Sequence, residues 1–161
     1  MKHPLGVTIN GVPYDRVVES RRTLLDFLRD ELGITGPKKG CDAGDCGCCM
    51  VLIDGVPMHS CLILAAEMEG RQVTTIEGLA RGDQLHPVQE AFIRCGAVQC
   101  GFCIPGIIIT AKAFLEEHPN PTTDEVIEAI SGHLCRCTGY LQIVDAIMAA
   151  AEAMRVPPQH A

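Results

Sequence analysis

The cysteines constrain this chain more than any other feature, because eight of its ten cysteines fall into two groups of four. The first cysteine group has the spacing C-x4-C-x2-C-x11-C and consists of Cys41, Cys46, Cys49 and Cys61. The second cysteine group has the spacing C-x2-C-x31-C-x1-C and consists of Cys100, Cys103, Cys135 and Cys137. Four thiolates are a complete ligand set for a metal ion or a metal cluster. The sequence therefore predicts two tetrathiolate sites.

The spacing of the first cysteine group is typical of plant-type 2Fe-2S clusters, in which a tight loop supplies three thiolates and a distant residue supplies the fourth. Gly44 and Gly47 lie in this loop and allow the backbone to wrap closely, so that amides can point at bridging sulfides. Zinc is the main alternative, because CxxC pairs do not separate the two metals. For the second cysteine group the spacing leaves the metal open. Electron transfer is the favoured function.

A secreted, disulfide-stapled domain would be another use for ten cysteines in 161 residues. The amino-terminal residues MKHPL open no apolar signal segment, which argues against it. No apolar run approaches the roughly 20 residues that span a bilayer. The net charge of -7 argues against a nucleic-acid or anionic-membrane surface. We therefore expect a soluble cytoplasmic protein with no nucleic-acid or membrane partner.

The chain divides near residue 80 into two parts, each of a size at which a hydrophobic core alone is marginal. Metal binding should therefore also stabilise the fold. In the first part, Asn10-Gly11 and Asp54-Gly55 are strong hairpin signals. The strands expected around them cover residues 7–9, 12–19, 50–53 and 56–59. With a helix capped by Thr23 over residues 24–31, the pattern predicts a small mixed sheet crossed by one helix.

After Gly82 the periodicity becomes helical. Glycine and proline separate four amphipathic or buried segments, which cover residues 88–98, 104–117, 123–134 and 141–154. Thr122 and Glu125 form a capping-box pattern at the start of the third segment. We expect a four-helix bundle in which the second cysteine group lies at inter-helix turns. Helix N-termini would favour a negatively charged cluster there.

Six motifs resemble those of one known family, the small iron-sulfur subunits of the molybdenum hydroxylases. The family includes the xanthine dehydrogenase, aldehyde oxidoreductase and aerobic carbon monoxide dehydrogenase types. The motifs are TING, LLDFLR, KKGCDAGDCGCC, TTIEG, VQCGFCIPG and LCRCTGY, and the resemblance covers residues 5 to about 155. It implies an α+β protein with an N-terminal ferredoxin-like beta-grasp domain over residues 1–80. A four-helix domain over residues 81–156 and a tail over 157–161 would follow.

The resemblance also implies the cofactors and partners. The first cysteine group would hold a solvent-side 2Fe-2S cluster, and the second a 2Fe-2S cluster nearer molybdenum. Gln99 and Cys137 would lie against the pterin, although Gln99 as an ordinary helix-end residue is the alternative. Partner subunits would carry the other cofactors: a large subunit the molybdopterin-type molybdenum cofactor, and a medium subunit FAD. The assembly would be a dimer of heterotrimers, with electrons passing from molybdenum through both clusters to FAD.

Other functions remain open at this point. The chain could be a free-standing two-cluster ferredoxin or a zinc-stabilised interaction module. The sequence has no nucleophile-base motif, no G-x-G-x-x-G and no P-loop, so we expect no catalytic site on this chain alone. The substrate of the complex, its final electron acceptor and the cluster potentials are not encoded in these motifs.

The remaining cysteines and histidines are expected to have structural roles. Cys48 and Cys95 are interpreted as small buried hydrophobic residues, with Cys48 as a less favoured rival to Cys49 for the first cluster. Surface or helix-capping positions are expected for His59, His86, His118 and His133.

Overall fold

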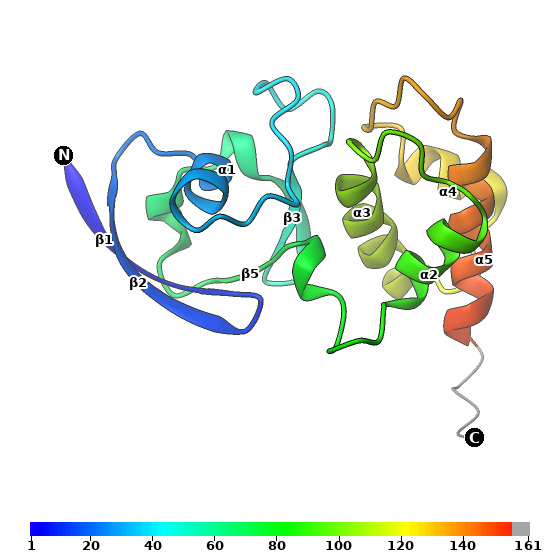
Figure 1. Ribbon diagram of the computed structural model, residues 1–161, viewed down its shortest axis with the longest axis horizontal. Helices are drawn as coiled ribbons and strands as arrows, with labels where there is room; N and C mark the ends of the chain where they lie inside the picture. Colours follow the sequence, from blue (N-terminus) through cyan, green and yellow to red (C-terminus); the bar gives the residue numbers. More distant parts are fainter. Residues whose placement is uncertain (156–161) are drawn as a thin grey trace.

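The computed structural model describes residues 1–155, in which a sheet with one crossing helix precedes a group of helices (Figure 1). The last residue of the predicted second domain, 156, and the predicted tail, 157–161, lie outside the described residues. The order of the elements confirms the α+β class.

The first part of the chain is built on a five-stranded mixed sheet in the order β2-β1-β5-β3-β4. The strands are β1 (Lys2–Ile9), β2 (Val12–Glu19), β3 (Met50–Ile53), β4 (Val56–His59) and β5 (Gln72–Thr74). Both predicted hairpins are confirmed, and all four of their turn residues have the positive φ of a tight hairpin turn. Strand β5 lies parallel to β1 and antiparallel to β3. It is absent from the sequence prediction because three residues are too few to show an alternating pattern.

One helix crosses this sheet, and it begins at the predicted cap. The hydroxyl of Thr23 accepts the N–H of Asp26 at 3.1 Å, at the start of α1 (Leu24–Asp26). The helix then widens into a π-type turn over Phe27–Glu31, which is a departure from the regular helix that the sequence predicts. The wider turn accompanies the full burial of Phe27 and Leu28 in the core of the sheet. Short 3₁₀ turns follow the later strands at Ser60–Leu62, Ala65–Met68 and Ile76–Gly78.

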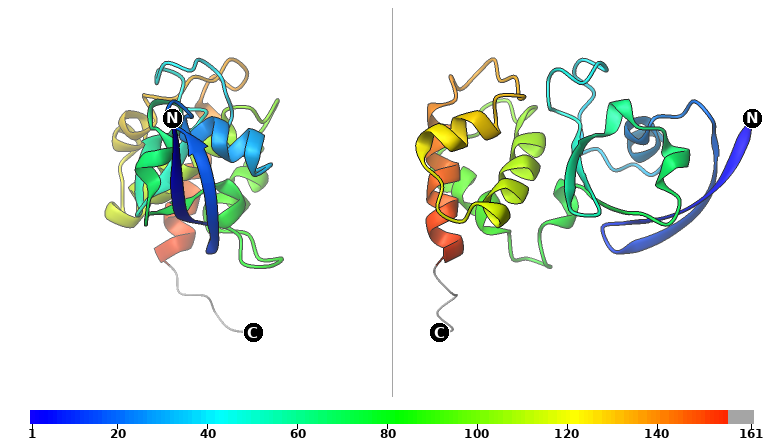
Figure 2. Two further views of the ribbon diagram at one scale, coloured as in Figure 1. Left: turned by 90° about the vertical axis from the view of Figure 1, so that its left-hand side faces the viewer. Right: turned by 180° about the vertical axis from the view of Figure 1, so that it is seen from behind.

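The second part confirms the predicted four-helix bundle (Figure 2). Its helices are α2 (Pro87–Arg94), α3 (Ile104–Glu117), α4 (Thr123–Ala129) and α5 (Leu141–Arg155). The capping box between Thr122 and Glu125 is present at the start of α4. In the part of the chain that the structure describes, no helix is both long and apolar enough to cross a membrane.

Two helices end earlier than the sequence predicts. Helix α2 stops at a Schellman-type turn, in which Gly96 has a φ of 63° and the N–H of Ala97 donates to the carbonyl of Phe92. Helix α4 stops at Ala129 rather than continuing to Leu134. The chain turns there toward the sheet, and the N–H of Leu134 donates to the carbonyl of Cys46.

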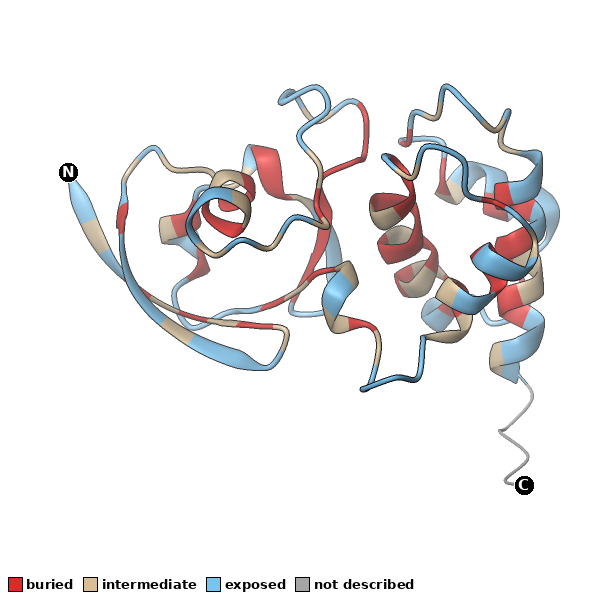
Figure 3. Ribbon diagram, in the orientation of Figure 1, coloured by how far each residue is buried: buried red, intermediate tan, exposed pale blue. Residues whose placement is uncertain are grey.

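Strand β3 contributes to both hydrophobic cores. Successive side chains of a strand point to opposite faces, and here Val51 and Ile53 pack with the sheet and α1, whereas Met50 and Leu52 pack with the helices. All four residues of β3 are buried, and Figure 3 shows that the neighbouring α3 is also largely buried. The two parts of the chain are therefore packed together through β3.

The backbones of the two parts approach closely where α3 meets the loop of the first cysteine group. A Cβ atom added at Gly106 of α3 would lie 2.2 Å from the carbonyl oxygen of Gly47. That distance is far shorter than any van der Waals contact, so only glycine permits this approach at position 106.

The variant Gly106→Ala should destabilise the protein by about 1–3 kcal/mol, because the added methyl group has no space and must displace α3 from the loop. The midpoint of thermal unfolding measures this effect. Gly132→Ala is the matched control, since a Cβ at Gly132 meets nothing within 4 Å. The control should stay within about 0.5 kcal/mol of the wild type. Equal midpoints for the two variants would contradict the close contact.

Candidate iron-sulfur centres

The first cysteine group lies in the loop before β3 and in the turn after β4. Cys41 is exposed, whereas the other three cysteines of this group are buried. Cys49 and Cys61 pack together with Leu25 in one small cluster. Cys46 acts on the thiol of Cys41, where hydrogen bonding from it helps to lower the pKa.

The second cysteine group lies at the end of the helix bundle that is next to the loop of the first cysteine group. Cys103 is the N-cap residue of α3, and Cys135 and Cys137 lie in the connection between α4 and α5. These sulfur atoms are paired as well. The Sγ atoms of Cys100 and Cys137 are 3.5 Å apart, and Cys135 acts on the thiol of Cys103, where it contributes to the raised pKa.

This pairing separates the two candidate metals. In a 2Fe-2S cluster each iron is bound by a pair of thiolates and by the bridging sulfides, whereas a structural zinc ion needs all four sulfurs around one point. Two pairs of sulfurs in each group fit a two-iron cluster better than a zinc ion.

Backbone amides point at the sulfur atoms of the first group. The N–H of Ala43 lies 3.4 Å from the sulfur of Cys41. This bond, together with those from Cys46, lowers the pKa of Cys41 to about 7. The amide of Gly44, a residue with a φ of 82°, faces the sulfur of Cys61. The backbone therefore favours the thiolate form that a metal requires.

Burial has the opposite effect on the inner thiols. It raises the pKa of Cys61 and of Cys103 to about 12 each. Burial acts the same way on Cys135, but hydrogen bonds with Thr138 prevail and lower its pKa to about 7. A buried thiol ionises readily only when a cation compensates its charge, and bound iron provides that compensation. The donor set therefore fits an iron cluster.

The two cysteines outside the groups have different surroundings. Cys48 is buried, as the sequence predicts, and its thiol faces the helical core, where it donates to the carbonyl of Cys46 at 3.6 Å. The next residue, Cys49, faces Cys61 instead. Cys95 is half-buried and packs against the helical core. The contact of Cys49 with Cys61, another member of the first cysteine group, supports Cys49 over Cys48 as the cluster ligand.

The loop before β3 and the connection between α4 and α5 lie on the same side of the molecule, as Figures 1 and 2 show. The N–H of Leu134 donates to the carbonyl of Cys46 at 3.1 Å and so joins the two loops directly. The outer thiols of the second group, Cys100 and Cys137, are exposed beside the exposed Gln99. An apolar groove of about 260 Å³ adjoins this surface, and its lining includes Ile76, Leu85, Ile93, Val98, Pro105 and Ile108.

The histidines follow the sequence prediction with one exception. His86 caps α2, because its Nδ1 accepts the N–H of Val88 at 3.3 Å, and His118 is exposed at the end of α3. His59 is half-buried, with its Nδ1 3.9 Å from the sulfur of Cys49. The prediction for His133 is wrong, because this residue is only 3 % exposed.

The environment of His133 is unusual for a turn residue. Its Nε2 lies 2.8 Å from the hydroxyl oxygen of Thr110, whereas its Nδ1 has no hydrogen-bond partner. Burial lowers the pKa of His133 to about 4, so the ring is neutral at pH 7. An unpaired buried polar atom costs on the order of 1–3 kcal/mol. Nothing in the sequence around His133 signals this burial, because the contacts that bury it come from distant segments.

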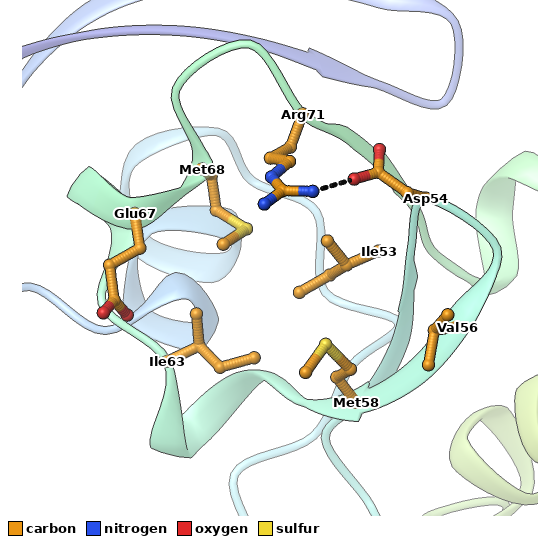
Figure 4. Close-up of a pocket in the computed structure, with 8 residues that line it drawn as sticks. All are labelled: Ile53, Asp54, Val56, Met58, Ile63, Glu67, Met68 and Arg71. Carbon is orange, nitrogen blue, oxygen red and sulfur yellow. Dashed lines mark hydrogen bonds and ion pairs between the residues drawn. The ribbon is translucent and has the colours of Figure 1, made fainter.

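A larger hollow of about 410 Å³ lies beside strands β3 and β4 (Figure 4). Its apolar wall includes Ile53, Met58 and Met68, and an ion pair between Arg71 and Asp54 at 2.7 Å crosses its rim. No cysteine lines it, so the hollow is not part of the iron-sulfur sites.

Comparison with known proteins assigns each half of the chain to a domain family. Residues 7–80 match the 2Fe-2S iron-sulfur cluster binding domain, and residues 75–148 match the 2Fe-2S binding domain. The two matches cover the two cysteine groups separately, one group to each domain.

Whole proteins with this pair of domains are also similar. The nicotine 6-hydroxylase small subunit of Paenarthrobacter nicotinovorans is 49% identical over 91% of this chain and 88% of its own length. A chain of quinoline 2-oxidoreductase from Pseudomonas putida 86 is 51% identical, with a TM-score of 0.92 over 96% of both chains. The aldehyde oxidoreductase of Desulfovibrio desulfuricans is 42% identical, with a TM-score of 0.90, but this chain covers only 17% of it. The chain belongs to the family of two-cluster iron-sulfur subunits of the molybdenum hydroxylases.

Proposed function

We propose that this chain relays electrons from a molybdopterin-type molybdenum cofactor to FAD, with each of these groups carried by a partner subunit. One observation carries the proposal: two paired-thiol sites lie side by side in one chain, and the bond from Leu134 to Cys46 joins their loops at 3.1 Å. Two bound 2Fe-2S clusters would supply one-electron redox centres at these sites. The chain acts as the iron-sulfur component of a multi-subunit oxidoreductase, and the reacting substrate binds elsewhere in the assembly.

We assign the first cysteine group to one cluster and the second cysteine group to the other. The pairing of the sulfur atoms supports this assignment. Amides of Ala43 and Gly44 donate toward the first site, which stabilises thiolate charge there. The N-terminus of α3 begins at Cys103, where the helix dipole favours negative charge at the second site.

We further propose that the second cluster is the one nearer molybdenum, and that Gln99 and Cys137 contact the pterin. The exposure of Cys100, Cys137 and Gln99 beside an apolar groove supports a subunit contact at this surface. A glutamine amide offers both a donor and an acceptor, as a pterin edge requires. In the aldehyde oxidoreductase of Desulfovibrio desulfuricans the equivalent region is part of a much longer chain, which supports a large partner.

We place the domain boundary between residues 80 and 81, which agrees with the region where the two family matches meet. A first domain over 1–80 and a second over 81–156 follow from it. Assembly with a large and a medium subunit as a dimer of heterotrimers stays a prediction, and so does a cytoplasmic location.

The proposal is tested by purifying the native complex through a tag on this chain. We expect about four irons and about four acid-labile sulfides per copy of the chain, as two 2Fe-2S clusters require. Molybdenum and FAD should be present in the co-purified subunits. A chain with both clusters but neither molybdenum nor FAD would indicate the free-standing ferredoxin instead. Zinc in place of iron would rule out electron transfer.

Single cysteine variants test the ligand assignment. Cys49→Ala should remove one of the two EPR signals of the reduced clusters and lower the thermal midpoint, because cluster binding and folding are coupled. Cys103→Ser should remove the other signal. Cys48→Ala and Cys95→Ala are the controls and should keep both signals, since neither residue belongs to the two cysteine groups. Loss of the first signal in Cys48→Ala but not in Cys49→Ala would reverse the assignment.

The variant Gln99→Leu tests the pterin contact in the assembled complex. Leucine has a similar volume but cannot hydrogen-bond, and an unpaired polar edge costs on the order of 1–3 kcal/mol. The affinity of the complex for the molybdenum cofactor should therefore fall about tenfold, while both EPR signals persist. Gln72→Leu, at an exposed position on β5, is the control and should retain the cofactor in full. Full cofactor content in Gln99→Leu would leave Gln99 as an ordinary surface residue.

A further inference from the structure

His133 is the one buried polar residue in the described chain whose hydrogen bonding is incomplete. The other two, Ser60 and Thr75, are satisfied: Ser60 donates to the carbonyl of Cys49 at 2.6 Å, and Thr75 bonds through both its backbone and its hydroxyl. His133 bonds Thr110 through Nε2, whereas its Nδ1 has no partner. Its place in the fold therefore needs an explanation other than hydrogen bonding.

The unpartnered edge of the ring lies against the loop of the first cysteine group. A Cβ atom at Gly47 would lie 2.2 Å from Nδ1 of His133. The carbonyl of Gly47 faces α3 at Gly106, and Thr110 follows Gly106 by one helical turn on the same face. The ring therefore lies between Gly47 and Thr110, and Gly47 contacts both the ring and α3.

The backbone of His133 is bonded to the loop of the second cysteine group. The hydroxyl of Tyr140 donates to the carbonyl of His133 at 3.0 Å and accepts the N–H of Cys135 at 2.8 Å. The side chain thus contacts the loop that contains Cys46, while the main chain is bonded to the loop that contains Cys135.

We propose that His133 is a positioning residue that fixes the separation of the two proposed clusters. The inference rests on the proposed function, because it takes the two cysteine groups as cluster ligands. A flat ring fills the narrow space above Gly47, and its bond to Thr110 prevents the ring from turning out of that space. Removing the ring leaves a void in which the two loops can shift relative to each other.

The experiment uses the full chain with both clusters bound and fully reduced. Magnetic coupling between neighbouring reduced clusters splits their EPR signals, and this splitting falls steeply as their separation grows. We expect His133→Ala to keep its iron but to lose the resolved splitting, and Thr110→Val to lose part of it. His133→Gln should restore the splitting, because a glutamine amide can reach the hydroxyl of Thr110. His118→Ala, at the exposed far end of α3, is the matched control and should match the wild type.

Wild-type splitting in both His133→Ala and Thr110→Val would overturn the inference and leave the proposed function intact. If His133→Ala takes up no iron, the splitting in Thr110→Val decides between the two outcomes. This variant removes only one hydroxyl from a half-buried residue, so it should still bind both clusters. Unsplit signals in the wild type would refute the close placement of the clusters. A wild-type chain without cluster signals would refute the proposed function itself.

Discussion

The contact between two glycines, Gly47 in the first cysteine loop and Gly106 in α3, is the constraint on which the rest of the site depends. Because Gly106 has no side chain, the helix backbone reaches the carbonyl of Gly47 directly, and because Gly47 has none, the ring of His133 lies against the loop. Cys46 adjoins one of these glycines, and Cys103 begins the helix that contains the other. The two groups of ligands are therefore brought together by backbone packing before any metal is considered.

Charge and burial are divided among the thiols in a way that links metal binding to folding. Cys61 and Cys103 are buried, and burial raises the pKa of each thiol, so their ionised forms are costly without a bound cation. Amide donors at the outer thiols offset part of that cost. A cluster would thus complete the core as well as the redox site, which fits a chain whose two parts are small.

The features that the sequence predicts correctly are those that depend on residues close together in the chain. The hairpin turns at Asn10-Gly11 and Asp54-Gly55 and the caps at Thr23 and Thr122 are local signals, and all four are present. The cysteine spacing separates the two groups but cannot show how the sulfurs pair within each group. The end of α4 and the burial of His133 also could not be predicted. Both depend on the loop around Cys46 and Gly47, which is distant in the sequence and near only after folding.

The packing of β3 on both faces has a consequence for modularity. Met50 and Leu52 belong to the sheet by hydrogen bonding and to the helical core by packing. A first part cut away at the linker would present these side chains to water, and an isolated bundle would lack part of its interior. The sequence thus divides into two parts, but each folded part depends on packing against the other. Exchanging either half with that of a relative requires the residues of β3 to be matched to the incoming helices.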